Sequence, residues 1–168
     1  MTRILLTLLL LLPTSSWAID AQVAFSPDRG ATELVIRTID SAHATIRMAA
    51  YAFTSSPIAA ALVEAHQRGI DVKVVVDKSN VTARYTAATF LANQGVPVTV
   101  DYQYSIMHDK FIVVDGMTVE EGSFNYTASA ESRNAENVLV LHDASVAGQY
   151  GKEWDRLWAE SEPMAARY

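Results

Sequence analysis

Hydrophobic and polar residues change their spacing several times along the chain, and each change marks a predicted element. Helices place apolar residues three and four positions apart, whereas buried strands appear as short continuous apolar runs. In the first half the predicted helices are 28–41, 57–68 and 80–95, and the predicted strands are 44–53, 71–77 and 96–101. Pro57 suits the first turn of its helix, and Gly69 and Gly95 suit positions just after a helix end.

The second half has a different order of elements. Asp115-Gly116 is a hairpin signal that joins two apolar runs, 110–116 and 117–124. A short helix around Ser129, a buried strand over 136–142 and an amphipathic helix over 143–161 follow. The whole pattern predicts an α/β fold: one mixed, largely parallel sheet with helices on both faces, formed by a single domain over residues 19–168.

Residues 1–18 stand apart and have the layout of a secretory signal peptide. Arg3 precedes an apolar run from Ile4 to Leu12, and Ser16-Trp17-Ala18 fits a cleavage site. The alternative is a membrane anchor, but this run has nine residues, whereas a spanning helix needs about 20. We therefore expect cleavage after Ala18 and export, in a bacterium to the periplasm.

Charge and cysteine content limit the possible chemistry. The chain has no cysteine, so thiol nucleophiles and cysteine metal sites are excluded, and an exported form cannot rely on disulfides. The formal net charge is −6 at pH 7, which gives no overall attraction for nucleic acid or anionic lipid. A polyanionic substrate must therefore be bound by positive charge concentrated in one place.

Charged residues open one of the buried runs, in the segment MHDKFIVVDG over 107–116. Residues two apart on a strand share a face, so His108 and Lys110 point the same way. The lysine disfavours protonation of the imidazole, which keeps it nucleophilic, and it attracts an anion such as phosphate. Ser123 and Asn125 are again two apart and can share a face with this pair. Together the four side chains predict a pocket for a tetrahedral oxyanion.

The same residues form a long motif. His108-x-Lys110, then Asp115 after four residues, then Gly122-Ser123-x-Asn125 after six more match the HxK(x4)D(x6)GSxN signature, the HKD motif, of the phospholipase D superfamily. With one motif copy and an N-terminal signal, the chain resembles the small secreted bacterial endonucleases of that superfamily, the Nuc type. The resemblance covers the chain beyond the signal and implies a phospholipase D-like α/β/α sandwich.

The resemblance also implies roles for the motif residues. His108 would attack phosphorus to form a covalent phosphohistidine, and a second motif histidine would protonate the leaving oxygen. Lys110, Ser123 and Asn125 would hold the non-bridging oxygens. Glu136, as the downstream glutamate, would hydrogen-bond the histidine. The family needs no metal or other cofactor, since the lysine supplies positive charge.

Asp115 belongs to the motif, and we count it among the candidate catalytic residues. Like Glu136, it is a carboxylate that can pair with Lys110 or orient His108. It can instead support the interface between subunits without touching the substrate. Its role is therefore left open between these alternatives.

The mechanism needs two motif histidines, and the chain has one. The other histidines, His43, His66 and His142, have no lysine two positions later, and we expect them to be structural or solvated. We therefore predict a two-fold homodimer in which His108 of both subunits faces a shared site.

Three functions compete. The first is an endonuclease that cleaves DNA, with RNA as a further substrate, and with little sequence preference; Lys78 and Arg84 then either contact the backbone or are simply solvated. The second is a phospholipase D-type hydrolase of phospholipid head groups, because the phosphodiester chemistry is the same. The third is a non-catalytic binding protein, which the intact motif disfavours. Trp154 and Trp158 are expected in core or dimer packing.

Overall fold

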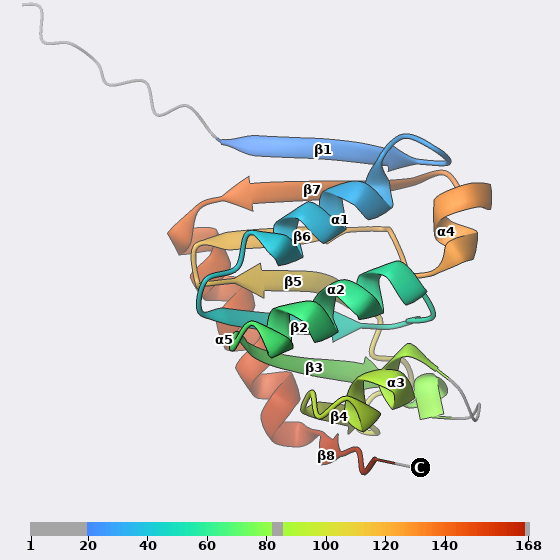
Figure 1. Cartoon of the computed structure of the whole chain (residues 1–168), viewed down its shortest axis with the longest axis vertical. Coiled ribbons are helices and arrows are strands. Elements are labelled where there is room, and N and C mark those ends of the chain that lie inside the picture. The colour runs from blue at the N-terminus through green and yellow to red at the C-terminus, as the bar shows by residue number, and fades with distance from the viewer. Residues whose placement is uncertain (1–19, 82–85, 167–168) are drawn as a thin grey trace, which may run out of the picture.

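The computed structural model describes residues 20–81 and 86–166, which form one sheet flanked by helices (Figure 1). The strands are β1 (Ala21–Ser26), β2 (Thr45–Ala50), β3 (Asp71–Asp77), β4 (Val98–Asp101), β5 (Lys110–Val114), β6 (Thr118–Gly122), β7 (Glu136–His142) and β8 (Glu162–Pro163). The helices are α1 (Ala31–Asp40), α2 (Ser56–Gln67), α3 (Ala87–Asn93), α4 (Ala128–Arg133) and α5 (Ala144–Glu160), with a short 3-10 helix, η1 (Lys78–Val81).

The sheet has eight strands in the order β1-β7-β6-β5-β2-β3-β4-β8. Its mixed character confirms the sequence prediction, but the expectation of a largely parallel sheet was wrong. Among the strands of the described residues, the parallel pairs are β2–β3 and β3–β4. The β5–β6 hairpin and its neighbours add antiparallel pairs on one side, and β8 adds another at the opposite edge.

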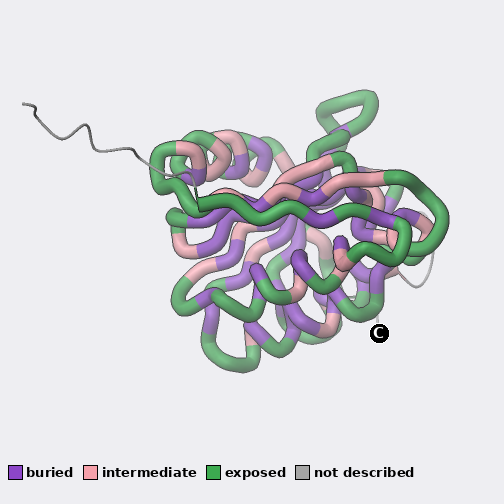
Figure 2. Tube along the Cα trace, turned by 90° about the horizontal axis from the view of Figure 1, so that it is seen from above, coloured by how far each residue is buried: buried purple, intermediate pink, exposed green. Residues whose placement is uncertain are grey.

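Helices cover both faces of the sheet and divide the core in two. Helices α1, α2 and α3 lie on one face and α5 on the other (Figure 1). Successive strand residues alternate between these layers: Val74 and Val76 belong to the larger core under α1–α3, whereas Val75 packs under α5. Figure 2 shows the resulting buried interior between exposed helix surfaces and loops.

Helix α5 forms the second layer with the apolar stripe that its sequence predicts. Trp154 is buried, donates a 2.9 Å hydrogen bond from Nε1 to the carbonyl oxygen of Met48, and stacks on Trp158 with ring centroids 5.0 Å apart. The two tryptophans therefore serve core packing, one of the alternatives expected for them.

Three local features differ from the sequence prediction. Strand β1 was not predicted, because as an edge strand it exposes four of its six residues, including Val23 and Phe25. The two-residue strand β8 was not predicted either. The helix expected over 80–95 is shorter: α3 is capped by the Thr86 side chain, which accepts from the Thr89 N–H, and Asn80 lies in η1.

The predicted signal peptide, residues 1–18, lies outside the described residues and stays a prediction. Within residues 20–81 and 86–166, none of the helices combines the length and apolar character that a membrane crossing requires.

Candidate active site

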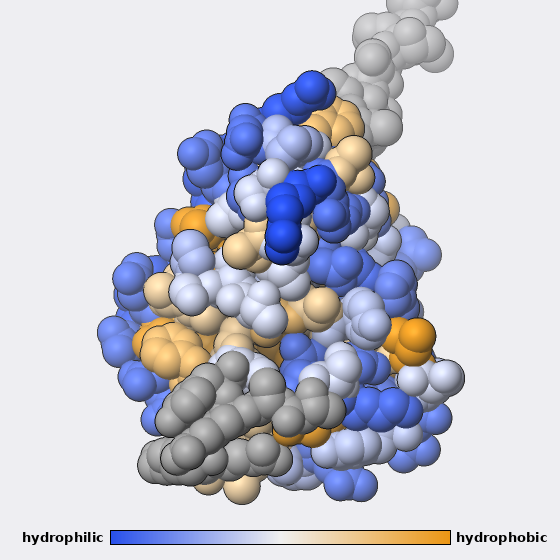
Figure 3. Space-filling view, turned by 90° about the vertical axis from the view of Figure 1, so that its right-hand side faces the viewer, coloured by the Kyte–Doolittle hydropathy of each residue, from blue (hydrophilic) through white to orange (hydrophobic). Residues whose placement is uncertain are grey.

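His108, Lys110, Ser123 and Glu136 lie at one end of the strands, where β5 and β7 begin, on the right in Figure 1. Figure 3 shows the molecule from that side. His108 lies in the loop that leads into β5, and Lys110 is the first residue of that strand. Ser123 follows the last residue of β6, and Glu136 is the first residue of β7. The antiparallel order β7-β6-β5 thus brings the start of two strands and the end of a third together.

His108 and Lys110 contact each other directly. Lys110 Nζ lies 3.2 Å from His108 Nδ1 and 2.5 Å from the carbonyl oxygen of the same histidine. His108 is exposed, whereas Lys110 is 8% exposed. Burial lowers the pKa of the Lys110 ammonium below its ordinary value, although the charges of Asp109 and Glu136 oppose this change. A largely buried cation beside an accessible imidazole suits an anionic ligand.

Ser123 and Glu136 form the second half of the site. Ser123 Oγ donates to Glu136 Oε2 at 2.6 Å and accepts from the Asn137 N–H at 3.1 Å. The second carboxylate oxygen of Glu136 accepts from Asn134 Nδ2 at 3.0 Å. In the free protein, Glu136 therefore binds the serine and Asn134, and its expected hydrogen bond to His108 stays a prediction.

Gly122 of the motif has a steric reason to be glycine. A Cβ at this position would lie 2.2 Å from the carbonyl oxygen of Asn137, because β6 and β7 approach closely here. This close approach holds Ser123 against the start of β7.

Asn125 brings an unsatisfied polar atom to the site. Its Oδ1 is buried and has no hydrogen-bond partner among the described residues. Buried polar atoms are nearly always paired, so this oxygen, two residues after Ser123, is an acceptor left for a ligand donor. An amide oxygen accepts and cannot donate to phosphate, so the phosphate-binding role that the resemblance implies would require the Asn125 Nδ2 group and stays a prediction.

Sequence reasoning missed a buried network behind His108. Asp77, 2% exposed at the end of β3, accepts the Met107 N–H at 2.9 Å and so fixes the residue before the histidine. Asn80 Nδ2 donates to the carbonyl oxygens of Asp77 and Tyr51 at 3.0 and 2.5 Å. The sequence could have indicated these residues, because Asp77 ends the predicted strand β3 and Tyr51 follows β2, and α/β proteins place their sites at the carboxyl ends of parallel strands.

Tyr51 itself lies against the motif pair. Its ring centroid is 4.6 Å from that of His108, and Lys110 Nζ lies 5.1 Å from the same tyrosine ring. Its backbone N–H also donates to the carbonyl oxygen of Asp109 at 3.0 Å. Tyr51 therefore forms one wall of the site and restricts both the imidazole and the ammonium.

Asp115 is the motif residue that the structure does not bring to the others. It follows the last residue of β5, at the opposite end of the strand from Lys110. Its carboxylate accepts the backbone N–H groups of His43, Ala44 and Thr45 at 2.7–2.8 Å. Neither expected pairing, with Lys110 or with His108, is present, and the carboxylate instead secures the start of β2.

The remaining candidates take other places. Lys78 Nζ donates to the carbonyl oxygen of Tyr104 at 2.8 Å, and Arg84 lies outside the described residues. His142 is 2.9 Å from Thr118 Oγ1 at the far end of β7, and His43 precedes β2 at the same far edge. Among the described residues, no three His, Cys, Asp or Glu side chains gather so as to hold a metal ion.

Comparison with known proteins agrees with this geometry. Residues 35–158 match the family described as "Cardiolipin synthase, PLD-like domain". Phospholipase D of Rickettsia bellii is 40% identical over 130 residues, which are 77% of this chain and 65% of the relative's length. Mitochondrial cardiolipin hydrolase of Xenopus laevis is 34% identical over 141 residues, or 84% of this chain and 67% of that relative.

Among solved structures, Nuc of Salmonella typhimurium, a phospholipase D family member, superposes with a TM-score of 0.84 and 41% identity, covering 88% of this chain and 99% of Nuc. The family match extends over most of the chain and includes His108, Lys110, Ser123, Asn125 and Glu136. The chain therefore belongs to the family of phospholipase D-like (PLD-like) domains.

Proposed function

We propose that this protein is a metal-independent phosphodiesterase that cleaves DNA and RNA through a phosphohistidine on His108. The observation that carries the proposal is the contact between the accessible imidazole of His108 and the buried ammonium of Lys110. Ser123 and Asn125 at the same end of the strands add a hydroxyl and an amide for the non-bridging phosphate oxygens. Such preorganised donors stabilise the charge that develops in the transition state.

The reaction has two displacement steps. The His108 imidazole attacks phosphorus, an N–P bond forms, and the P–O bond to the leaving group breaks. His108 of the partner subunit gives its proton to the leaving oxygen. That histidine then takes a proton from water, whose oxygen attacks phosphorus and breaks the N–P bond, which restores both residues.

Lys110 has to change partner as the substrate binds. An ammonium can only donate, so in the free protein it uses the lone pair of His108 Nδ1. An attack through Nδ1 needs that lone pair, and an attack through Nε2 needs a proton on Nδ1. In both cases Lys110 must leave Nδ1, and the phosphate oxygens offer it a stronger, charge-assisted partner.

The proposed homodimer places this end of the strands at its two-fold axis. The loop before His108 exposes three large apolar side chains, Tyr102, Tyr104 and Ile106. Adjacent exposed apolar groups favour contact with another protein surface. A second copy docked here would cover them and bring the two His108 side chains toward one phosphate. The predicted signal peptide would deliver the dimer outside the cytoplasm.

Phospholipid hydrolysis is the alternative function. The relatives named phospholipase D and cardiolipin hydrolase favour it, whereas the likeness to Nuc over nearly the whole of that chain favours nucleic acid. Hydrolysis of phospholipid and hydrolysis of nucleic acid would use the same phosphate chemistry at His108. The surroundings of the phosphate pocket then decide the substrate.

Nicking of supercoiled plasmid in EDTA tests the proposal, with wild type compared with His108→Ala. We expect wild type to nick DNA and degrade RNA in EDTA, and the variant to be inactive. Release of head groups from phospholipid vesicles without nicking would establish the alternative. Loss of cleavage in EDTA would contradict a metal-independent mechanism, and a strictly monomeric active enzyme in sedimentation would contradict the shared site.

A further inference from the structure

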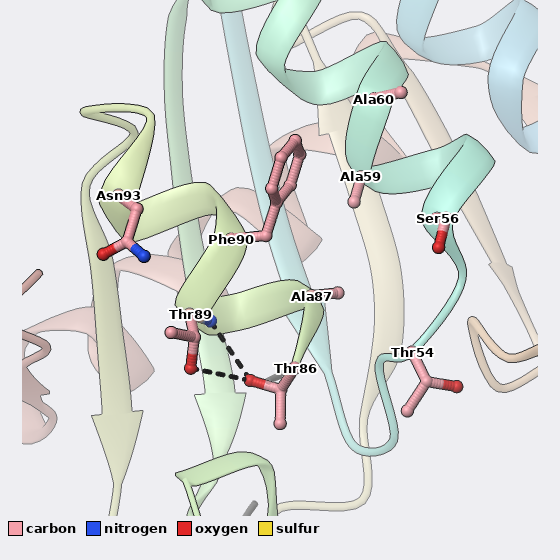
Figure 4. Close-up of a pocket in the computed structure, with 9 residues that line it drawn as sticks. All are labelled: Thr54, Ser56, Ala59, Ala60, Thr86, Ala87, Thr89, Phe90 and Asn93. Carbon is pink, nitrogen blue, oxygen red and sulfur yellow. Dashed lines mark hydrogen bonds between the residues drawn. The ribbon is translucent and has the colours of Figure 1, made fainter. Parts of the chain in front are cut away.

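A cavity of about 510 Å³ opens between α2 and α3, outside the phosphate pocket. Its wall includes Thr54, Ser56, Ala59, Ala60, Thr86 and Phe90. Phe90 is 43% exposed, an unusual position for a phenylalanine, and Figure 4 shows its ring directed toward the two alanines of α2. A cavity of this size is in the range of small-molecule pockets.

The cavity lies on the same face of the sheet as the candidate nucleophile. Lys110 precedes Ile112 by two residues, and the Ile112 side chain belongs to the core under α1–α3, so Lys110 also points to that face. Helices α2 and α3, which enclose the cavity, cover this face (Figure 1). A bound strand can therefore reach both places without crossing the sheet.

The rim of the cavity is connected to the phosphate pocket by short links. The N–H groups of Thr54 and Ser55 both donate at 2.9 Å to the carbonyl oxygen of Tyr126, the residue after Asn125. Thr54 is also three residues from Tyr51, so the Cα atoms of these two residues lie at most about 11 Å apart. The Tyr51 ring in turn lies against His108. The Tyr51 side chain and its contact with His108 add to this backbone distance, so the cavity and the phosphate pocket are separated by a short stretch of a bound strand.

The lining matches a flat heterocycle better than an acyl chain. The Phe90 ring and the alanine methyl groups offer apolar surface to the two faces of a ring. The hydroxyl groups of Thr54 and Thr86 lie at one end of the cavity, and that of Ser56 lies beside Ala59 on α2 (Figure 4). A nucleobase has polar edge atoms that can pair with the Thr54 and Ser56 hydroxyls, whereas an acyl chain has none; the Thr86 hydroxyl is already paired with Thr89.

We propose that this cavity is a base-binding subsite, in which Phe90 stacks on a nucleobase within a few nucleotides of the scissile phosphate. The subsite rests on the proposed nuclease function and specifies its substrate as a strand with an unpaired base. Stacking accepts every base, so the subsite increases affinity without imposing a sequence.

Cleavage of single-stranded oligonucleotides, each with one abasic residue at a different position, tests this subsite. For wild type we expect kcat/KM at a given phosphate to fall about 5- to 150-fold when one particular neighbour within a few nucleotides is abasic. In Phe90→Ala and Phe90→Leu this position effect disappears, whereas Phe90→Trp retains it. Met117→Ala, which alters an exposed apolar side chain at the β5–β6 turn, serves as the control and keeps the effect.

The possible failures are distinguishable. If wild type cleaves nucleic acid at the same rate whether or not neighbours are abasic, the subsite is wrong and the proposed function stands. If the effect persists in Phe90→Ala, the base binds elsewhere. If wild type cleaves only phosphatidylglycerol vesicles and Phe90→Ala slows that reaction, the cavity holds an acyl chain and both proposals fall.

Discussion

The ammonium of Lys110 lies 3.2 Å from Nδ1 of His108, so the two motif residues bind each other before any substrate arrives. Both side chains emerge at the start of β5, while the rest of that strand is buried. This contact holds the ammonium at the proposed phosphate site. When an anion binds, Lys110 can exchange its hydrogen bond to the imidazole for one to the anion.

Removing the Lys110 charge should slow cleavage strongly. Lys110→Met retains most of the chain length but no longer donates to a phosphate oxygen, so we expect kcat to fall about 100- to 1000-fold. Steady-state plasmid nicking measures the change, and Lys152→Met, an exposed lysine of α5, provides the matched control. Activity above a tenth of wild type in Lys110→Met would contradict the proposed role.

Asp77 should matter for activity although it touches no substrate. In Asp77→Asn an amide N–H₂ replaces one of the two acceptors that hold Met107 and Ser79. We expect a loss of about 1–3 kcal/mol in the free energy of unfolding. We also expect kcat to fall about 10- to 100-fold with little change in KM, because His108 loses its alignment. Urea unfolding and steady-state kinetics check the two effects.

Asp115 should affect the stability of the protein but not its catalysis. Burial raises the pKa of its carboxyl, but the hydrogen bonds from the Thr45, His43 and Ala44 N–H groups outweigh it and hold the pKa below the ordinary value. The stabilisation is thus present above the unfolded pKa and is lost as the pH falls through the folded one.

The variant that tests this assignment is Asp115→Asn. We expect it to lose about 1–3 kcal/mol of unfolding free energy at pH 7. Its kcat should remain within about twofold of wild type, because the carboxylate lies at the far end of β5. Urea unfolding at pH 7 and pH 3 together with nicking kinetics would show this; a kcat loss as large as that of Asp77→Asn would return Asp115 to the catalytic residues.

Asp77 and Asp115 show which features of the site could be predicted from the sequence and which could not. The motif spacing predicted that His108 and Lys110 share a face, and they contact each other, because strand alternation is a local rule. Glu136, which came from the resemblance and not from the spacing, bonds to Ser123. Spacing alone could not tell that Asp115 turns away at the strand end. Nor could it place Asp77, whose contact with Met107 depends on how β3 and the loop before β5 pack.

The fold, too, could be predicted from the sequence only in part. Continuous apolar runs predicted β2, β3, β5 and β7 well, but they carry no information on strand direction. The parallel expectation therefore failed where the β5–β6 hairpin joins β2 and β7 in antiparallel pairs. Edge strand β1 escaped notice because its exposed side resembles a loop.

Glu120 should make stability depend on pH. It is fully buried beside Tyr126, whose Oη donates to it at 2.8 Å, and burial raises the pKa of Glu120 to about 8. Between the unfolded pKa near 4.3 and this value the folded state holds the proton more tightly. The free energy of unfolding therefore falls as pH rises, by up to about 1.4 kcal/mol per pH unit.

Glu120→Gln removes this titrating group and keeps the shape of the side chain. We expect the difference in unfolding free energy between wild type and variant to change steadily from pH 5 to pH 8 and to level off above that. Urea unfolding at several pH values measures it. A difference that is constant over this range would show that Glu120 is ionised in the folded protein.

The central claim is that His108 becomes covalently bound to the phosphate. Rapid mixing of enzyme with end-labelled oligonucleotide, followed by an alkaline quench, tests it most directly. The account predicts a DNA–protein adduct that is stable in alkali, lost in acid, located at His108 by mass spectrometry and absent in His108→Ala. Adduct formation at another residue, or undiminished cleavage by His108→Ala, would contradict it.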